Sequence, residues 1–344
     1  MKKWMAVFLA LAAMLCACTA LAGETRQFTD DAGRTVTLDE QITRIAVSGV
    51  GAQIAVFALA PEMLVGVTGE WDEGSEAFID EAYCSLPVIG QLYGGKGNLN
   101  LETLLMAAPQ VVIDVGETKD GIAQDLDALT AQTGIPFVHI AMSLEHMDET
   151  YEKLGVLLGL EARAQVLAAY CREVYDRTKA IGEAAQKTRL LYVTGETHLG
   201  VIAKNSYHSP VIDMLSDNVA VIDSPSAKGT GNETDLEQIL MWDPDVIVFS
   251  SRSTYEEAQR DPLWQAVRAV AEGNYVLVPQ LPYNFMGFPP SAQRLLGMTW
   301  MAKTLYPELA QYDLYEEIGR HFDLFYHCDL SRGQYELLMT GSAQ

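Results

Sequence analysis

Apolar residues along this chain occur in short runs that alternate with longer segments of helical periodicity. The segment FTDDAGRTVTL predicts a hairpin, because a turn of Asp, Ala, Gly and Arg precedes a stretch of alternating polarity. A buried strand at 44–47, a helix at 52–60 ended by Pro61, and a strand at 64–67 are expected next. This order is typical of a parallel α/β unit.

Two stretches of the chain repeat one pattern, NLETLLMAAPQVVI at 100–113 and DLEQILMWDPDVIV at 235–248. Each predicts a short helix, a proline that stops it, and a buried strand. Packing explains the shared Leu, Met, Pro and Val residues, so we expect these to be buried. Packing does not explain the shared glutamate. Over the thirteen positions from Leu101 and Leu236, six residues are identical: Leu101/Leu236, Glu102/Glu237, Leu105/Leu240, Met106/Met241, Pro109/Pro244 and Val111/Val246.

The same alternation of helices and strands continues in both halves of the chain. It predicts two α/β lobes, and a mature chain of about 320 residues exceeds what one hydrophobic core normally serves. The remaining predicted helices are 122–133, 209–215, 263–271 and 291–305, and the remaining strands are 136–140, 189–193, 200–203, 246–250 and 275–278.

Residues 144–185 show helical periodicity almost throughout, with Gly155 and Gly159 as interruptions. We therefore expect a long, rigid helix to join an N-terminal lobe at 27–143 to a C-terminal lobe at 186–344. The predicted fold class is α/β, with a ligand cleft between the two lobes and little relative motion of the lobes.

The N-terminus has the features of a secretory signal, because Lys2 and Lys3 precede an apolar run that is too short for a permanent membrane helix. Two processing sites compete. The sequence LCAC resembles a lipobox that would lipidate Cys18, and ALA fits cleavage after Ala22. We expect residues 1–22 to act as a signal peptide, favour the lipoprotein, and place the mature protein in the periplasm or on the outer face of the cytoplasmic membrane.

The formal net charge of −23 narrows the choice of partners. A strongly acidic protein is repelled by nucleic acid and by anionic membrane surfaces, so we expect no nucleic-acid partner and membrane contact only through a lipid anchor. In a chain with this excess of acidic residues, a cluster of basic residues is a stronger sign of a binding site for an anion.

The chain contains no GxSxG, HExxH or P-loop sequence, so we expect no catalytic residues and no resident cofactor. An exported enzyme on the same scaffold is the alternative from another class. Cys84, Cys171 and Cys328 show no metal-ligand spacing and are expected to be buried or partly buried thiols, with one disulfide left open.

Several features in this order resemble the ABC-importer substrate-binding proteins for ferric siderophores, haem and vitamin B12. They are the exported N-terminus, FTDDAGRTVTL followed by RIAVSG, the LE phrase in each half, the long helical segment, and WQAVRAVAEGNYVLVP. The resemblance covers residues 27–325. It implies two lobes bridged by a rigid helix, a ligand held between them, and an ABC permease with its ATPase as partners.

In that family, one surface glutamate of each lobe docks onto arginines of the permease. The matching positions here are Glu102 and Glu237, and charge-assisted pairs with Arg are directional and strong. The alternative is a structural role, since a glutamate in the first turn of a helix interacts favourably with the helix dipole.

Loops at the strand ends that face the cleft supply the candidate ligand-binding residues. Lys96, Lys228 and Arg252 would suit an anionic ligand, although loops carry charged residues in any case, and Tyr283, Asn284 and Phe285 could pack on a macrocycle. The full set is Ser48, Tyr93, Lys96, Glu117, His198, Tyr207, Lys228, Arg252, Tyr283, Asn284 and Phe285.

The predicted function is capture of an iron chelate, either a ferric siderophore or a haem-like molecule, for delivery to the permease. Cobalamin or another corrinoid, molybdate or tungstate, and a nickel chelate are the alternatives in the same role. A site for a bare metal ion is not expected, because His198 and His208 do not form a set of three or four ligands.

Overall fold

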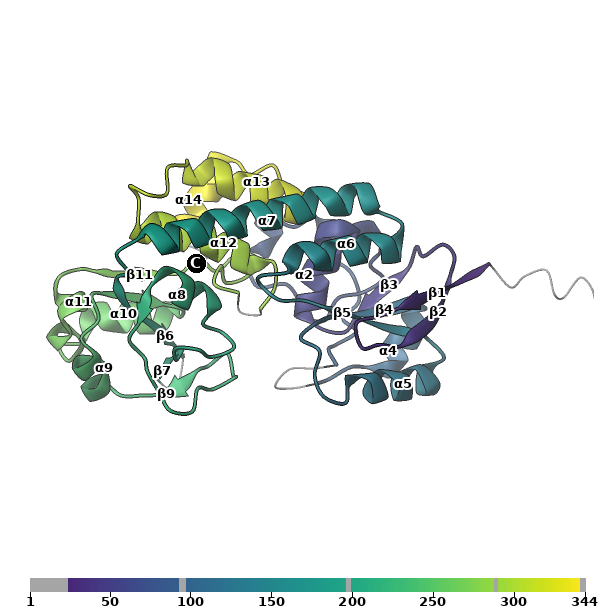
Figure 1. Cartoon of the computed structure of the whole chain (residues 1–344), viewed down its shortest axis with the longest axis horizontal. Helices are drawn as coiled ribbons and strands as arrows, with labels where there is room; N and C mark the ends of the chain where they lie inside the picture. The colour runs from purple at the N-terminus through teal and green to yellow at the C-terminus, as the bar shows by residue number, and fades with distance from the viewer. Residues whose placement is uncertain (1–23, 93–96, 196–198, 288–289, 341–344) are drawn as a thin grey trace, which may run out of the picture.

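Two α/β lobes are joined along one side by the helix α7 (Glu161–Ala184) (Figure 1). The computed structural model describes residues 24–92, 97–195, 199–287 and 290–340. None of the described helices is long and apolar enough to cross a membrane. The predicted fold class is confirmed.

The first lobe contains the predicted hairpin and a three-stranded parallel sheet in the order β3-β4-β5. Residues 64–67, predicted as a strand, make isolated bridges from Leu64 to Ile45 and from Val67 to Val88 instead. The elements of this lobe are β1 (Thr25–Thr29), β2 (Thr35–Asp39), β3 (Ile45–Val47), α2 (Val50–Leu59), η1 (Pro61–Met63), η2 (Ser75–Ala77), α3 (Glu81–Cys84), α4 (Leu101–Ala107), β4 (Val111–Gly116), α5 (Ile122–Thr133) and β5 (Phe137–Ala141).

The segment 144–185 forms two helices, α6 (Met147–Leu158) and α7, so the prediction of one continuous helix was wrong. Gly159 ends α6 in the left-handed region with φ of 69°, and α7 then runs back alongside α6 and on to the second lobe (Figure 1). Gly155 allows the close contact, since a Cβ atom there would lie 2.5 Å from Cβ of Ala164.

The second lobe contains a sheet in the order β11-β10-β6-β7-β9, with β8 paired to β6. Residues 252–260, of which Arg252 was expected in a cleft loop, form the helix α10, and the predicted helix 263–271 is divided into η3 and α11. The elements of this lobe are β6 (Arg189–Thr194), β7 (Gly200–Val201), α8 (Pro210–Leu215), β8 (Asp217–Asn218), β9 (Asn232–Glu233), α9 (Leu236–Trp242), β10 (Val246–Phe249), α10 (Arg252–Arg260), η3 (Trp264–Ala266), α11 (Arg268–Ala271) and β11 (Tyr275–Leu277).

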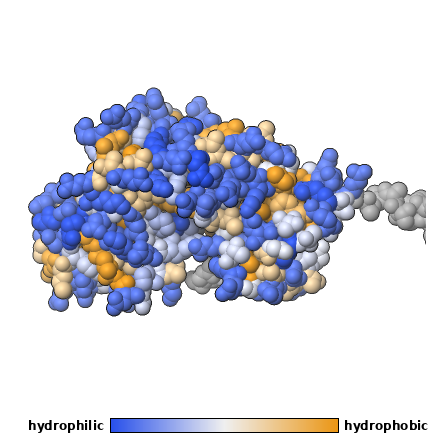
Figure 2. Space-filling model, in the orientation of Figure 1, coloured by the Kyte–Doolittle hydropathy of each residue, from blue (hydrophilic) through white to orange (hydrophobic). Residues whose placement is uncertain are grey.

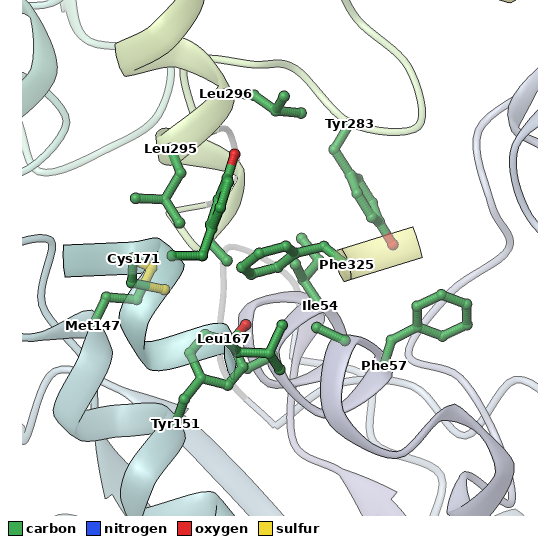
Figure 3. Packing of buried hydrophobic residues seen from close by; sticks show 14 of the residues in the cluster. Ile54, Phe57, Met147, Tyr151, Leu167, Cys171, Tyr283, Leu295, Leu296 and Phe325 are labelled. Atoms are coloured by element: carbon green, nitrogen blue, oxygen red, sulfur yellow. The ribbon is translucent and has the colours of Figure 1, made fainter. Parts of the chain in front are cut away.

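Three C-terminal helices, α12 (Gln293–Leu305), α13 (Leu314–Tyr326) and α14 (Arg332–Thr340), complete the protein on the same side as α7 (Figure 1). One hydrophobic core includes residues of α2, α6, α7, α12 and α13, and so extends through both lobes. Figure 3 shows Ile54 and Phe57 of α2 close to Phe325 of α13, with Leu167 of α7 beside them.

The three cysteines outside the signal segment are free thiols, as predicted. Cys171 is buried in this shared core, while Cys84 and Cys328 are half-buried.

The contact between α7 and α8 of the second lobe can be tested by substitution. A Cβ atom at Gly182 would lie 2.4 Å from the carbonyl oxygen of Met214 in α8. Gly182→Ala should therefore lower the free energy of unfolding by about 1–3 kcal/mol, because a backbone carbonyl cannot move aside as a flexible side chain would. Chemical denaturation measures this change.

Gly319→Ala is the matched control, since Gly319 lies within α13 and an added Cβ there meets nothing within 4 Å. It should raise the free energy of unfolding by up to about 1 kcal/mol through helix propensity. A Gly182→Ala protein as stable as the Gly319→Ala protein would contradict the tight α7–α8 contact.

Candidate ligand cleft and docking face

Two adjoining cavities lie between the lobes and share Glu117, Tyr207 and Pro290 in their walls. Their volumes are about 210 Å³ and 300 Å³. Figure 2 shows the notch between the lobes on the side opposite α7. The cavities therefore occupy the position that an α/β fold reserves for ligands, beyond the carboxyl ends of its strands.

The first cavity is formed mainly by residues that follow two parallel strands of the first lobe. Residues 48–52 follow β3 and begin α2, and residues 114–117 end β4. The first turn of α2 faces the cavity, and Gly49 has no side chain to cap the backbone N–H groups of that turn. A Cβ atom at Gly51 would lie 3.2 Å from the carbonyl oxygen of Pro290, so glycine permits this close approach across the cleft.

A chain of hydrogen bonds holds the base of the first cavity. Ser48 Oγ donates to Asp114 Oδ1, and the ring Nδ1 of His139 lies 2.7 Å from Asp114 Oδ2. Because a carboxylate only accepts hydrogen bonds, His139 donates through Nδ1. The other ring nitrogen, Nε2, lies 3.0 Å from Thr118 Oγ1. Asp114 thus has polar partners on both oxygens.

The second cavity contains Arg294, a buried arginine from the first turn of α12. Its Nη2 donates to the carbonyl oxygen of Tyr207 at 2.9 Å, and its guanidinium lies over the Tyr207 ring at 5.5 Å. The Nε atom is buried and has no hydrogen-bond partner among the described residues. No ion pair with a described carboxylate includes Arg294, so its buried Nε–H stays without a partner among the described residues.

Burial dominates the electrostatics around Arg294. It lowers the pKa of the Arg294 guanidinium, against the opposing influence of Tyr207 and Glu117. Burial raises the pKa of Tyr207, and the negative charge of Glu117 adds to that shift. The pKa of His208 is lowered to about 4, first by burial and then by the charge of Arg294, so His208 is neutral near pH 7.

Three of the predicted ligand-binding residues line the cavities. Ser48 contributes to the first cavity, and Glu117 and Tyr207 contribute to both. Tyr93, Lys96 and His198, and the predicted lipidation site Cys18, lie outside the described residues.

Two predicted basic residues line neither cavity. Lys228 is exposed in the loop before β9. Arg252 begins α10, where its Nη1 lies 3.8 Å from Glu256 Oε1. The sequence pattern did not predict α10, which is why Arg252 was expected in a cleft loop.

The predicted aromatic cluster is part of the core instead. Phe285, which was expected to contact ligand, is fully buried in the core and lines neither described cavity. Tyr283 OH accepts a hydrogen bond of 3.1 Å from Gln53 Nε2, and Asn284 Nδ2 donates to Ser250 and Gln280. Tyr283 thus joins the second lobe to α2, whereas Asn284 is bonded within the second lobe. The sequence pattern could not distinguish these roles, because an aromatic loop packs equally well on a core or on a ligand.

Arg294, like Lys119 in the first cavity, was missed in the sequence analysis. Arg294 was counted as part of a packed helix, since it lies within the predicted helix 291–305. The available signal was an arginine among apolar residues just after two prolines, in a chain with 23 basic and 46 acidic side chains.

The two repeated helices place Glu102 and Glu237 on the protein surface. Both side chains are exposed in the first turn of α4 and α9. Figure 1 shows α4 and α9 on the same side of the molecule, one in each lobe, away from α7. The geometry agrees with a two-point contact to one partner.

No group of three His, Cys, Asp or Glu side chains in the described part of the chain is arranged to hold a metal ion. The cleft instead combines a cation, hydroxyl groups and helix N–H donors around a small volume. Such a site binds by hydrogen bonds and charge.

Known proteins with this sequence pattern and fold are transport proteins. A model of the periplasmic binding protein family matches residues 59–281, more than half of the chain. The molybdate-binding protein MolA of Haemophilus influenzae is 24% identical over 352 residues, which cover 92% of this chain and 95% of MolA.

Solved structures show the same architecture. An ABC transporter solute-binding protein from Sulfurospirillum deleyianum is 26% identical with a TM-score of 0.82, and the match covers 92% of this chain and 99% of that one. MolA bound to molybdate shares the fold at 21% identity and a TM-score of 0.70, over 89% of this chain and 99% of MolA. The chain belongs to the periplasmic binding protein family and is the extracytoplasmic solute-binding component of an ABC transporter.

Proposed function

We propose that this protein captures a compact oxyanion of the molybdate and tungstate class and delivers it to the permease of an ABC importer. Arg294 carries the proposal, because a buried guanidinium with an unused N–H donor is costly unless an anion pairs with it. Arginine is also the side chain best suited to a planar arrangement of oxygen acceptors.

The start of α2 supplies a second source of positive potential. The first turn of this ten-residue helix lines the neighbouring cavity, and the N–H groups of a helix N-terminus attract anions. Tyr207 adds a hydroxyl group to both cavities, whereas the Ser48 hydroxyl already donates to Asp114. Hydrogen-bond donors from both lobes would therefore surround an anion that bridges the cavities.

Each of the two described cavities is small enough to suit a compact anion. Cavities of about 210 and 300 Å³ lie at or below the lower end of the range of about 300–1,000 Å³ for small-molecule sites. The loop expected to pack on a macrocycle has Phe285 in the core. For these reasons we place the oxyanion before the iron chelate that the sequence pattern favoured.

The relationship to MolA supports the same ligand class. MolA, which this chain matches over 95% of its length, is a molybdate-binding protein. We further propose that the mature protein needs no resident cofactor, that Cys18 carries a lipid anchor, and that Glu102 and Glu237 dock on the permease.

Ligand binding is the direct test. Titration calorimetry of the purified protein against molybdate, tungstate, sulfate and phosphate, and against a ferric siderophore, haem and cobalamin, should show saturable binding of molybdate or tungstate with one site. Binding of a chelate or corrinoid with no response to the oxyanions would contradict the proposed ligand class.

Arg294→Met should weaken molybdate binding by about tenfold to a hundredfold, the value of a hydrogen bond to a charged group. Arg294→Lys should recover part of this loss, because it restores the charge without the planar fork. Glu117→Gln is the control of opposite sign: removal of a negative charge from the rim of both cavities should tighten anion binding. Weaker binding in Glu117→Gln would indicate a cationic or neutral ligand.

The docking role of the glutamates is tested separately. Glu102→Ala with Glu237→Ala should abolish transport in cells while the ligand Kd stays within about twofold, since both residues lie outside the cleft. Glu152→Ala with Glu183→Ala, two exposed glutamates on α6 and α7, should leave transport intact. Loss of ligand affinity in the first double variant would assign Glu102 and Glu237 to ligand binding.

A further inference from the structure

Four of the repeated apolar residues are exposed, contrary to the expectation that packing explains them. The exposed fraction is 50% for Leu105 and 73% for Met106 in α4, and 43% for Leu240 and 78% for Met241 in α9. Met241 and Met106 are more exposed than any other large apolar side chain in the described residues. The repeat therefore preserves two apolar surfaces as well as two glutamates.

In each lobe, the exposed apolar pair shares a helix face with the glutamate. Residues three and four positions apart are neighbours on a helix surface, so Glu102 lies beside Leu105 and Met106. The same spacing applies to Glu237 in α9. We name Leu105 and Met106 the first pad, and Leu240 and Met241 the second pad.

Both helices are held firmly at their N-terminal ends and on their inner faces. Asn100 Oδ1 accepts hydrogen bonds of 3.1 Å from the backbone N–H groups of Glu102 and Thr103. Asp235 Oδ1 accepts one of 2.8 Å from the N–H of Gln238. On the inner faces, Leu104 and Ile239 are fully buried, and burial at positions 101–110 matches that at 236–245 position by position.

An arginine holds the C-terminal end of each helix. Arg44 Nε donates to the carbonyl oxygen of Ala108 at 3.0 Å, and Arg189 Nη2 donates to that of Trp242 at 2.5 Å. Arg44 stands directly before β3, and Arg189 begins β6, so the two helices are anchored to their sheets in the same way. The pads are thus presented on rigid supports.

The two pads belong to helices that lie along the same edge of the protein. Figure 1 shows α4 and α9 at the edge opposite α7, and Figure 2 shows apolar surface at the lower edges of both lobes. Because the lobes share one hydrophobic core, the spacing between the pads is set by the fold. A single partner that binds both pads must therefore offer two equivalent sites at that spacing.

We propose that the first and second pads insert into two equivalent apolar pockets on a two-fold symmetric permease, each pocket bordered by a cation that pairs with the neighbouring glutamate. This proposal rests on the proposed docking function of Glu102 and Glu237. The glutamates would steer the encounter, and the pads would supply the apolar burial that slows dissociation.

The charge around the pads selects this partner over a second copy or a lipid surface. Glu102 lies beside the first pad and Glu237 lies beside the second, on a chain with a formal net charge of −23. A second copy would bring these carboxylates together, and an anionic membrane would repel them. A permease surface with an apolar centre and a cationic border is complementary to both features.

The test compares binding of the full chain to the permease–ATPase complex of the same cell, reconstituted in nanodiscs, by biolayer interferometry. Met106→Gln and Met241→Gln should each raise the docking Kd about tenfold, and the double variant should raise it about a hundredfold, through lost apolar burial. The molybdate Kd and the melting temperature should not change, because both side chains are exposed. Val156→Thr with Val166→Thr, on α6 and α7 with exposed fractions of 55% and 53%, should dock as the unmodified protein does.

The glutamate variants separate this inference from the docking function itself. If Glu102→Ala with Glu237→Ala loses docking but Met106→Gln with Met241→Gln does not, the proposed role of the pads is overturned and the docking function of the glutamates stands. If both variants dock normally, both proposals fail. Reduced self-association in sedimentation would assign the pads to a second copy, and reduced binding to protein-free nanodiscs would assign them to lipid; either result would overturn the proposal.

Discussion

One hydrophobic core that continues from the first lobe into the second is the constraint on which the cleft and the docking face depend. It packs α2 against α13 and α7 against α12, so separation of the lobes would expose apolar side chains such as Phe57, Leu167 and Phe325 to water (Figure 3). The hydrogen bond from Gln53 to Tyr283 adds a polar contact between the lobes. A cleft held in this way is largely formed before ligand arrives, which reduces the ordering cost of binding.

The same rigidity gives the docking face its geometry. Two binding points on a rigid body act together only if the partner matches their spacing, and the second contact then forms at a high effective concentration. The equivalent anchoring of α4 and α9, by a cap, a buried side chain and an arginine, keeps both faces in matching orientations.

The fold was predictable where periodicity and stop signals agreed. Helix 122–133 was predicted with its observed bounds, because an amphipathic run ends at a glycine that adopts φ of 71°. The turn at Gly159 was missed, since α6 and α7 each bury a face and the helical period continues through the reversal. Helix α10 was missed for the opposite reason: RSTYEEAQR buries only Thr254 and Ala258 and so has little apolar periodicity. The site was harder to predict, because Phe285 and Arg294 are assigned to core or cleft by tertiary packing and not by local pattern.

Charged side chains are normally exposed and large apolar side chains are normally buried. Arg294 is a buried charge and the two pads are exposed apolar side chains, so both depart from this rule, in opposite directions. A buried guanidinium with a free donor destabilises the protein unless an anion is present, and an exposed pair of Leu and Met adds nothing to stability unless a partner covers it. The exposure of the pads is hard to attribute to chance, since the same residues occupy the same exposed positions in both lobes. In the proposed function, each cost would be removed by a different partner: an anionic ligand would pair with Arg294 in the cleft, and the permease would then cover the pads.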